Sequence, residues 1–339
     1  MISNRTKVAI KIFITLALLG FLAYQMDLNV LVEILWSANP GFILLGALIQ
    51  FTSMFIGVVR WQTILKNFGI NSRLVPLIKI TFIGYFFNLF LPSGIGGDFF
   101  RSYYLAKRED RGMSTTVTTT ILERSAGLCA LLIIGTSFAA LQDISVEGVR
   151  LFYVFLIMIL LYLLGILALF HSWMHRRISS FLIKRNLEHS EDKMELVYQG
   201  LNALRCNKGS ILKALVLSLV IQFLSVLIVW VAAQAIHIEA SFGVFLIFVP
   251  LINLSIMVPL TINGIGLRES LFYLLFSQIG LPVEMAVGLS LVTFALYILT
   301  ASPGLVIYSL YKKEEHLDEM VVEPLTPDQQ TTDQPTKDR

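Results

Sequence analysis

The stretch Phe90-Leu-Pro-Ser-Gly-Ile-Gly-Gly-Asp-Phe-Phe-Arg101 decides the fold class of this chain. It ends an apolar segment that is too short to cross a bilayer comfortably, and proline and glycine interrupt it before a carboxylate and a guanidinium follow. A second version, Val258-Pro-Leu-Thr-Ile-Asn-Gly-Ile-Gly-Leu-Arg-Glu269, comes late in the chain. Two broken, charged and glycine-rich apolar segments in corresponding halves of a chain indicate a transport site at membrane depth.

The composition predicts an all-α, polytopic helical membrane protein. The 339 residues are 56% hydrophobic and 14% charged, with a mean hydropathy of +0.75, whereas soluble domains carry about 25% charged residues. We expect about six full spans, since a span needs about 20 apolar residues. These predicted spans are 8–25, 41–59, 113–141, 149–170, 211–236 and 285–311. The regions 77–105 and 242–281 remain, and each contains a break at its glycine motif.

Lysine and arginine predict the orientation, because cytoplasmic loops carry an excess of both. Basic residues precede the first span and flank 77–100 on both sides, so this segment is predicted to enter and leave from the cytoplasm as a re-entrant hairpin. The region 242–281 begins and ends on the opposite side and is either a second hairpin or two short crossings. The halves then share one order with opposite topology, which is an inverted repeat. We expect a multi-pass protein of the inner (cytoplasmic) cell membrane with both termini in the cytoplasm.

Residues 1–312 are predicted to form one transmembrane domain with a cytoplasmic loop at 171–210. The acidic segment 313–339 is predicted to be a disordered cytoplasmic tail, because it has too few apolar residues to form a core. The two cysteines, Cys129 and Cys206, do not suggest a disulfide framework or a metal site, and we expect no metal and no cofactor. Neither a P-loop nor a catalytic serine elbow occurs, so we expect no enzyme and no direct use of ATP.

Ionisable side chains inside the apolar segments are the candidate site residues, because each costs about 2.5–3.5 kcal/mol on insertion scales. The planar fork of arginine suits phosphate oxygens, so three arginines are predicted to bind the phosphate of a headgroup. They are Arg101, Arg124 and Arg268. Three carboxylates are predicted to balance these charges or to carry protons. They are Asp98, Glu123 and Glu269.

For the charged residues of the first half, a binding role and a purely structural role both stay open. Asp98 and Arg101 stand three residues apart on one helix face and can pair, which would also suit an ordinary interfacial ion pair. The side chains of Glu123 and Arg124 diverge by about 100°, so each needs a partner from another helix. An arginine of either glycine motif suits Glu123, and an acidic residue of either motif suits Arg124. They either line a cavity or form a buried lock between the hairpins and the bundle.

The prolines and glycines of the two motifs are predicted hinges, since glycine permits close backbone approach and proline stops the preceding helix. They are Pro92, Gly94, Gly96, Gly97, Pro259, Gly264 and Gly266. A helix that starts near Leu267 would aim its N–H groups into the cavity, and an ordinary loop between two short helices is the alternative. Arg60, Trp61 and Asn88 are predicted at the interface, where Asn88 can also bond the broken backbone.

At these residues the chain resembles the lysylphosphatidylglycerol synthase transmembrane-region family, the flippase-like integral membrane proteins. The resemblance covers nearly all of residues 5–312 and rests on four pieces of sequence. They are Arg60-Trp61, Asn88 through Pro92-Ser-Gly-Ile-Gly-Gly-Asp98 and Arg101, Glu123-Arg124, and Asn263-Gly-Ile-Gly-Leu-Arg-Glu269. Bifunctional members of the family carry a soluble aminoacyl-transferase as well. This sequence has no such domain, so the resemblance implies lipid translocation and argues against lipid aminoacylation.

We therefore expect a lipid translocase (flippase) that moves a phospholipid or a polyprenyl-phosphate-linked lipid between leaflets by alternating access. Two alternatives remain. One is a membrane-embedded transferase acting on a lipid-linked substrate, with Glu123 or Asp98 as its base. The other is an accessory subunit of a lipid-modifying synthase. The expected partners are a membrane lipid and, in the last alternative, a lipid-synthesising enzyme. No nucleic acid is expected.

Overall fold

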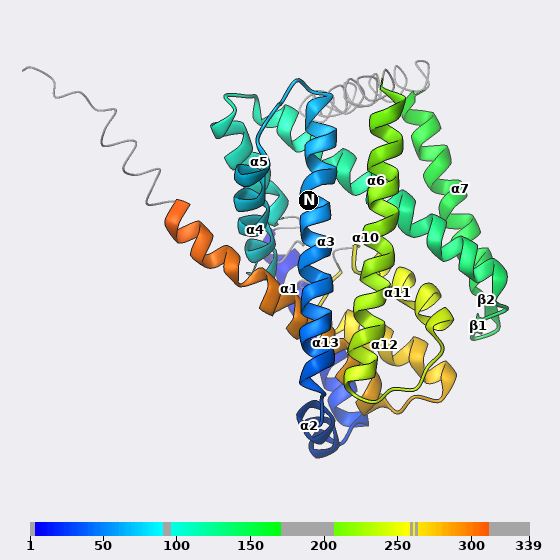
Figure 1. The fold of residues 1–339 in the computed structure, drawn as a ribbon. Coiled ribbons are helices and arrows are strands. Elements are labelled where there is room, and N and C mark those ends of the chain that lie inside the picture. Colours follow the sequence, from blue (N-terminus) through cyan, green and yellow to red (C-terminus); the bar gives the residue numbers. More distant parts are fainter. Residues whose placement is uncertain (1–3, 91–95, 171–206, 258–259, 262–263, 312–339) are drawn as a thin grey trace, which may run out of the picture.

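The chain folds into a bundle of helices (Figure 1). The structure is a computed structural model that describes residues 4–90, 96–170, 207–257, 260–261 and 264–311. Four helices are long and apolar enough to cross a membrane, so the predicted all-α, polytopic membrane fold is confirmed. The predicted loop 171–210 lies outside the described residues up to position 206, and the predicted tail 313–339 lies outside them entirely.

The elements follow one another in this order. The helices are α1 (Asn4–Gln25), α2 (Leu28–Trp36), α3 (Pro40–Lys66), α4 (Leu74–Phe90), α5 (Gly96–Arg108), α6 (Met113–Leu141), α7 (Leu151–Phe170), α10 (Lys208–Ala235), α11 (Phe242–Met257), α12 (Leu267–Phe276), the 3-10 turn η1 (Ser277–Ile279) and α13 (Val283–Ala301). Strands β1 (Ser145–Val146) and β2 (Val149–Arg150) form a small antiparallel hairpin before α7. Beyond α13 the helical path continues to Tyr311.

The four long spans are α3, α6, α10 and α13 with its extension. They match four of the predicted spans. The predicted span 8–25 ends in a 90° bend between α1 and α2. Asp27 begins the new helix there, because its side chain accepts the N–H of Asn29 at 2.8 Å while its own N–H donates to Glu284. The apolar part of α7 is shorter than a full span. Length and composition thus give four spans among the described residues, or five with the bent pair, and a total of six is not confirmed.

Helices α4 and α5 pack side by side, with both outer ends at one end of the bundle (Figure 1). Arg111 after α5 donates to the carbonyl of Gly69 before α4, which ties these outer ends together. The close approach requires glycine on both helices, because a Cβ on Gly97 would lie 1.9 Å from the carbonyl oxygen of Gly84. This arrangement agrees with the predicted hairpin over 77–105.

Helices α11 and α12 return to the opposite end of the bundle, where α10 ends and α13 begins (Figure 1). α10 lies antiparallel to α3 in the most extensive helix contact of the described chain. At one end of this contact the N–H of Asn39 donates to Ala235 O at 2.8 Å, and further along Arg60 donates to Ser218 Oγ at 3.0 Å. The order α3 to α6 is therefore repeated by α10 to α13 in the reverse direction.

The two sets of four helices are interlocked. α4 of the first set packs against α13 of the second, and α11 of the second packs against α6 of the first. Each contact thus has a counterpart when the sets are exchanged, as an inverted repeat requires. A large buried core joins α6, α10, α11, α12 and α13, and a smaller one joins α3, α4 and α5. Aliphatic side chains cover the outer face of α7, with Leu161, Leu164 and Leu167 each more than 60% exposed, as suits a surface in contact with lipid.

Candidate functional site

Glu123 on α6 is a buried carboxylate that bonds two arginines. Its Oε1 accepts from Arg60 Nη2 at 3.0 Å, and its Oε2 accepts from Arg101 Nη2 at 2.9 Å. Glu123 is 4% exposed. Because Arg60 lies on α3 and Arg101 on α5, this one carboxylate joins three helices in the bundle interior. Glu123 was predicted to pair with an arginine of either glycine motif, and in the structure it pairs with the arginine of the first motif.

Asp98 continues the series of charges. Its Oδ1 lies 3.5 Å from Arg101 Nη1, and its Oδ2 accepts from Arg124 Nε. The chain of ion pairs therefore runs Arg60, Glu123, Arg101, Asp98, Arg124, with one more cation than anion. Its buried members have side chains 12% exposed or less, whereas the Arg124 side chain is 38% exposed. We call these five residues the charge chain.

Arg101 lies deep in the charge chain and not at the wall of the cavity described below. Its guanidinium sits over the Trp61 ring, 4.3 Å from the ring centre, and Trp61 Nε1 donates to Thr119 Oγ1 at 3.2 Å. Trp61 is fully buried. We predicted Arg60 and Trp61 at the interface because the second span was expected to end at residue 59. In the structure α3 continues to Lys66, which carries both residues inside the bundle.

The second glycine motif forms a smaller cluster at the start of α12. Arg268 Nε lies 3.0 Å from both Glu269 Oε1 and Ser290 Oγ, and its guanidinium sits over the Phe294 ring at 4.2 Å. The N–H of Gly266 donates to Glu269 Oε2 at 2.7 Å. We predicted that the first N–H groups of this helix point into the cavity. Glu269 instead caps one of them, so this carboxylate serves its own helix.

The hinge glycines differ in what they require. Gly264 and Gly266 have φ angles of 75° and 81°, a backbone region that strongly favours glycine. Gly96 begins α5, and the N–H of Gly97 donates to Asn88 Oδ1 at 2.9 Å. Asn88 therefore bonds the backbone beside the break, as predicted. The predicted hinge residues Pro92, Gly94 and Pro259 lie outside the described residues.

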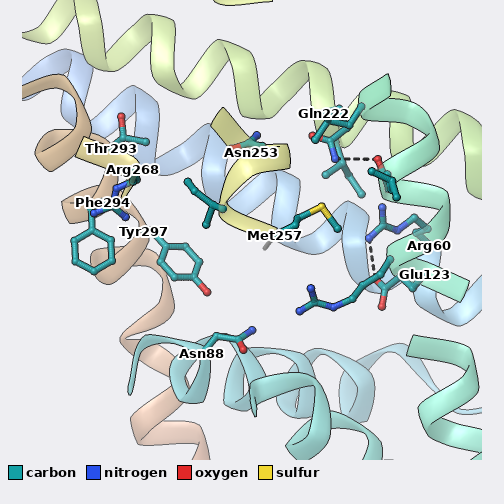
Figure 2. A pocket seen from close by; sticks show the side chains of 16 residues that line it. Arg60, Asn88, Glu123, Gln222, Asn253, Met257, Arg268, Thr293, Phe294 and Tyr297 are labelled. Atoms are coloured by element: carbon teal, nitrogen blue, oxygen red, sulfur yellow. Dashed lines mark hydrogen bonds and ion pairs between the residues drawn. The ribbon is translucent and has the colours of Figure 1, made fainter. Parts of the chain in front are cut away.

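A cavity of about 490 Å³ lies where the two halves meet (Figure 2). Its volume is in the range of small-molecule sites. Apolar side chains line part of its wall, among them Leu128, Ile221 and Met257. The polar and charged residues of the wall come from both halves. They are Arg60, Asn88, Glu123, Arg124, Gln222, Asn253, Arg268, Thr293 and Tyr297. Of the predicted phosphate-binding residues, Arg124 and Arg268 thus reach the cavity.

The cavity wall follows the internal repeat. The sequence offset that places Gly264 after Gly94 also relates residues on α6 to residues on α13. The related pairs are Glu123 and Thr293, Arg124 and Phe294, and Gly127 and Tyr297, and all six line the cavity. The cavity therefore lies between equivalent positions of the two halves. Its charge does not follow the repeat, because a glutamate and an arginine in the first half correspond to a threonine and a phenylalanine in the second.

Sequence reasoning missed several members of this site. Gln222 donates to the carbonyl of Gly127 at 3.2 Å, and Asn253 donates to Ser225 Oγ at 3.2 Å. Their amides interrupt long apolar runs on α10 and α11, and that interruption was the available signal. Arg60 was noticed but assigned to the interface. Among the described residues, no group of three or more His, Cys, Asp and Glu side chains could hold a metal ion.

Comparison with known proteins identifies the family of the chain. The chain is 26% identical to a UPF0104 membrane protein of Methanocaldococcus jannaschii over 331 residues, covering 91% of this chain and 96% of that protein. It is 30% identical to a UPF0104 membrane protein of Pyrococcus horikoshii over 112 residues, which is 33% of each chain. No solved structure matches the chain significantly. The family described as "Lysylphosphatidylglycerol synthase TM region" matches residues 8–304, and the chain belongs to this family of multi-pass membrane proteins.

Proposed function

We propose that this protein is a lipid translocase that moves a phosphate-bearing lipid, either a phospholipid or a polyprenyl-phosphate-linked lipid, between the leaflets of the cell membrane. The observation that carries the proposal is the cavity between the halves, where guanidiniums of both glycine-motif halves face one space. An ionisable group at membrane depth is a functional-site hypothesis by default, because such groups are expensive to keep there.

The charge of the cavity suits an anionic headgroup. The charge chain carries one net positive charge, and its terminal member Arg124 lies on the cavity wall. Arg268 faces the same cavity and shares its charge with Glu269 alone among the described carboxylates. Arg60 also lines the cavity, and its buried Nε has no hydrogen-bond partner in the described part of the chain. A phosphate accepts several such donors at once.

The rest of the wall suits the remaining parts of a lipid. Asn88, Asn253 and Tyr297 offer hydrogen-bonding groups for a polar headgroup, and Met257 offers apolar surface beside them (Figure 2). A cavity of this size holds a headgroup and leaves the acyl chains in the bilayer. Such an arrangement suits the movement of a lipid between leaflets, because the free-energy cost of that movement lies in taking the polar headgroup through the apolar part of the membrane.

The inverted arrangement supports an alternating-access mechanism. The two hairpins start from opposite ends of the bundle and meet at the cavity, as in transporters built from inverted repeats. Rocking of one half against the other along the α3–α10 contact would expose the cavity to each leaflet in turn. We infer from the excess of lysine and arginine at the end with Lys66, Arg108 and Lys208 that this end faces the cytoplasm.

Reconstitution tests the proposal. Purified protein is placed in phosphatidylglycerol and phosphatidylcholine vesicles with a trace of fluorescent phosphatidylglycerol, and dithionite bleaching reports how fast inner-leaflet probe becomes accessible. Removing the cavity charge in Arg124→Gln is expected to slow translocation about tenfold or more, in line with the loss of a charge-assisted phosphate contact. Arg150→Gln removes a charge from an exposed pair on the β-hairpin and is the matched control.

Protein-free vesicles set the background rate, and a polyprenyl-phosphate probe run in parallel tests the other lipid class. Translocation at the wild-type rate by Arg124→Gln, or rates with both probes no faster than background, would contradict the proposal.

A further inference from the structure

Helix α2 lies at the end of the bundle where α3 begins (Figure 1). The chain turns by 90° between α1 and α2, so α2 does not continue the direction of α1. α1 has 22 residues, about the number that a full span needs, and α2 is therefore not required to complete a crossing. Asp27 and Ser37 cap α2 at its two ends, and α3 starts shortly afterwards at Pro40. α2 is thus a separate short helix between two membrane helices.

One side of α2 is buried against the bundle. Leu31 packs with Leu22 of α1 and Val287 of α13 in a small apolar core. At the start of α2, the N–H of Asp27 donates to Glu284 Oε1 at 3.0 Å, and Glu284 lies in the first turn of α13. These contacts hold α2 at the beginning of α13 and fix which of its sides faces the bundle.

The exposed side chains of α2 form an apolar group and a polar group. Leu28, Val32 and Trp36 follow one another at intervals of four residues, so at about 100° per residue they form one stripe along the helix. Each of the three is at least 50% exposed. We call them the α2 stripe. Asn29 and Glu33 lie on the side opposite the bundle, and the α2 stripe occupies the flank between that polar side and the buried side.

The α2 stripe continues an apolar surface that α1 presents along the membrane. Phe13, Leu16 and Tyr24 share one face of α1, and each is more than 60% exposed. Tyr24 stands beside the last residue of α1, directly before the bend. The surface therefore ends in a tyrosine on α1 and in Trp36 on α2. Both residue types are enriched where a membrane meets water, because each combines an apolar ring with a polar group.

Lipid suits the three sides of α2 better than water does. Leucine, valine and tryptophan side chains gain free energy when they leave water, while Asn29 and Glu33 keep their hydration on the side away from the bundle. A helix with such sides is stable at the boundary between headgroups and acyl chains. Glu33 gives the polar side a negative charge, so attraction to anionic headgroups adds nothing and the contact is an apolar one.

We propose that α2 is an interfacial helix that lies flat in one membrane leaflet, with the α2 stripe against the glycerol and upper acyl region of the lipids. The leaflet is the non-cytoplasmic one, because α2 lies at the end of the bundle opposite to Lys66. This contact holds whether or not the protein translocates lipids. It joins that leaflet to α13, the helix that brings Thr293 and Tyr297 to the central cavity.

Spin labels measure the depth of α2 in the bilayer. In the full-length chain with Cys129 and Cys206 replaced, nitroxides are placed on single cysteines in Leu28→Cys, Val32→Cys and Trp36→Cys. Power saturation in phosphatidylcholine vesicles then compares collisions with oxygen, which concentrates in lipid, and with a water-soluble nickel chelate. A flat helix keeps the three depths within about 3 Å, whereas a helix entering the bilayer along its axis spreads them over about 12 Å, at about 1.5 Å per residue.

Labels on the other exposed positions of α2 are the matched controls. Asn29→Cys and Glu33→Cys should respond to the nickel chelate and not to oxygen. Val30→Cys is the sharpest control, because Val30 is exposed and apolar but lies outside the α2 stripe. We expect its label in water, so that position on the helix and not residue type decides the result. Size-exclusion profiles that match the parent chain show that each variant is folded, and any two stripe positions suffice to fix the tilt.

Three results would overturn the proposal. A depth difference above about 6 Å between positions 28 and 36 would mean that α2 enters the bilayer as part of a broken span or a re-entrant loop. Access of the nickel chelate to the α2 stripe equal to that at Glu33→Cys would mean that water covers it. Dipolar coupling between Val32→Cys labels of two copies that persists on dilution with lipid would mean that a second chain covers it.

Discussion

The guanidinium of Arg101 sits 4.3 Å from the centre of the Trp61 ring, buried between α5 and α3. The same guanidinium bonds Glu123 and reaches Asp98. A side chain held by two carboxylates and an indole face has few directions left in which to bind a ligand. Arg101 therefore fixes the hairpin to the bundle, and Arg124, at the end of the charge chain, is the member that lines the cavity and would face a ligand in the proposed function.

Because of the charge chain, we expect the loss of Glu123 and the loss of Arg101 to lower stability by different amounts. Replacing Glu123 in Glu123→Gln leaves the chain with two surplus positive charges, whereas Arg101→Gln leaves each carboxylate with one arginine. Breaking a buried pair with an unpaired charge left behind costs about 3–5 kcal/mol. We expect Glu123→Gln to lower the melting temperature in detergent clearly more than Arg101→Gln does. Glu109→Gln, which breaks only a loose surface pair, is the control. A larger loss for Arg101→Gln would contradict this electrostatic account.

The hairpin of α4 and α5 depends on Gly97. An added Cβ would lie 1.9 Å from the carbonyl oxygen of Gly84, which is backbone and cannot move aside alone. Gly97→Ala should destabilise the protein by about 1–3 kcal/mol, as overpacked sites do. Gly165→Ala on α7 has no atom within 4 Å of the new methyl and should be neutral or stabilising. Thermal unfolding of the two variants side by side measures the difference, and equal melting temperatures would show that the helices have room to separate.

Glu269 caps α12 from inside the bundle. Glu269→Gln removes the charge that accepts the Gly266 N–H and pairs with Arg268, and the residue is only 3% exposed. Hydrogen bonds to charged groups contribute about 1.5–3 kcal/mol, and we expect a loss of this order. Glu284→Gln provides the matched comparison, because Glu284 also accepts a backbone N–H, that of Asp27, but does so at the surface. Its loss should stay below about 1 kcal/mol. Chemical denaturation in detergent distinguishes the two.

Cysteine labelling tests the opposed hairpins. In a chain with Cys129 and Cys206 replaced, single cysteines are placed at the exposed positions of Arg73 and Asp110, which flank α4 and α5. A membrane-impermeant maleimide should reach both from the same face of sealed vesicles.

A second pair of single cysteines reports on the other hairpin. Cysteines at Ser241 and Gln278, which flank α11 and α12, should react only from the opposite face. Labelling of the Arg73 and Asp110 positions from different faces would break the inverted repeat, and the proposed mechanism would fail with it.

The sequence predicted the long helices well because length and apolar composition alone select α3, α6, α10 and α13. It also narrowed the partners of Glu123 and Arg124, since adjacent helical side chains diverge and must each find a charge elsewhere. In the structure, Glu123 pairs with Arg101 and Arg124 pairs with Asp98. Which of two motifs supplies a partner depends on packing between helices far apart in sequence, and local patterns do not contain that information.

Other features had no clear sequence signal. Gly84 lies in an apolar helix away from both glycine motifs, and its importance arises only from contact with Gly97. Gln222 and Asn253 are isolated amides whose meeting at one cavity depends on how α10 and α11 fold against α6. The end of the second predicted span was wrong for a simpler reason, because Arg60, the charged end of an apolar run, was taken as the end of a helix that continues to Lys66.

The cavity lies between equivalent positions of the halves, yet one half contributes Glu123 and Arg124 where the other contributes Thr293 and Phe294. If the two halves exchanged conformations, the resulting state would not be a mirror copy of the first. The charged side of the cavity would adopt the conformation that the uncharged side had before, and the uncharged side would adopt that of the charged side. The two end states of the cycle would then differ in free energy even in a symmetric bilayer without a gradient. The protein would therefore favour one of the two end states at rest. This preference would follow from the residues of the two helices and would not depend on an energy source.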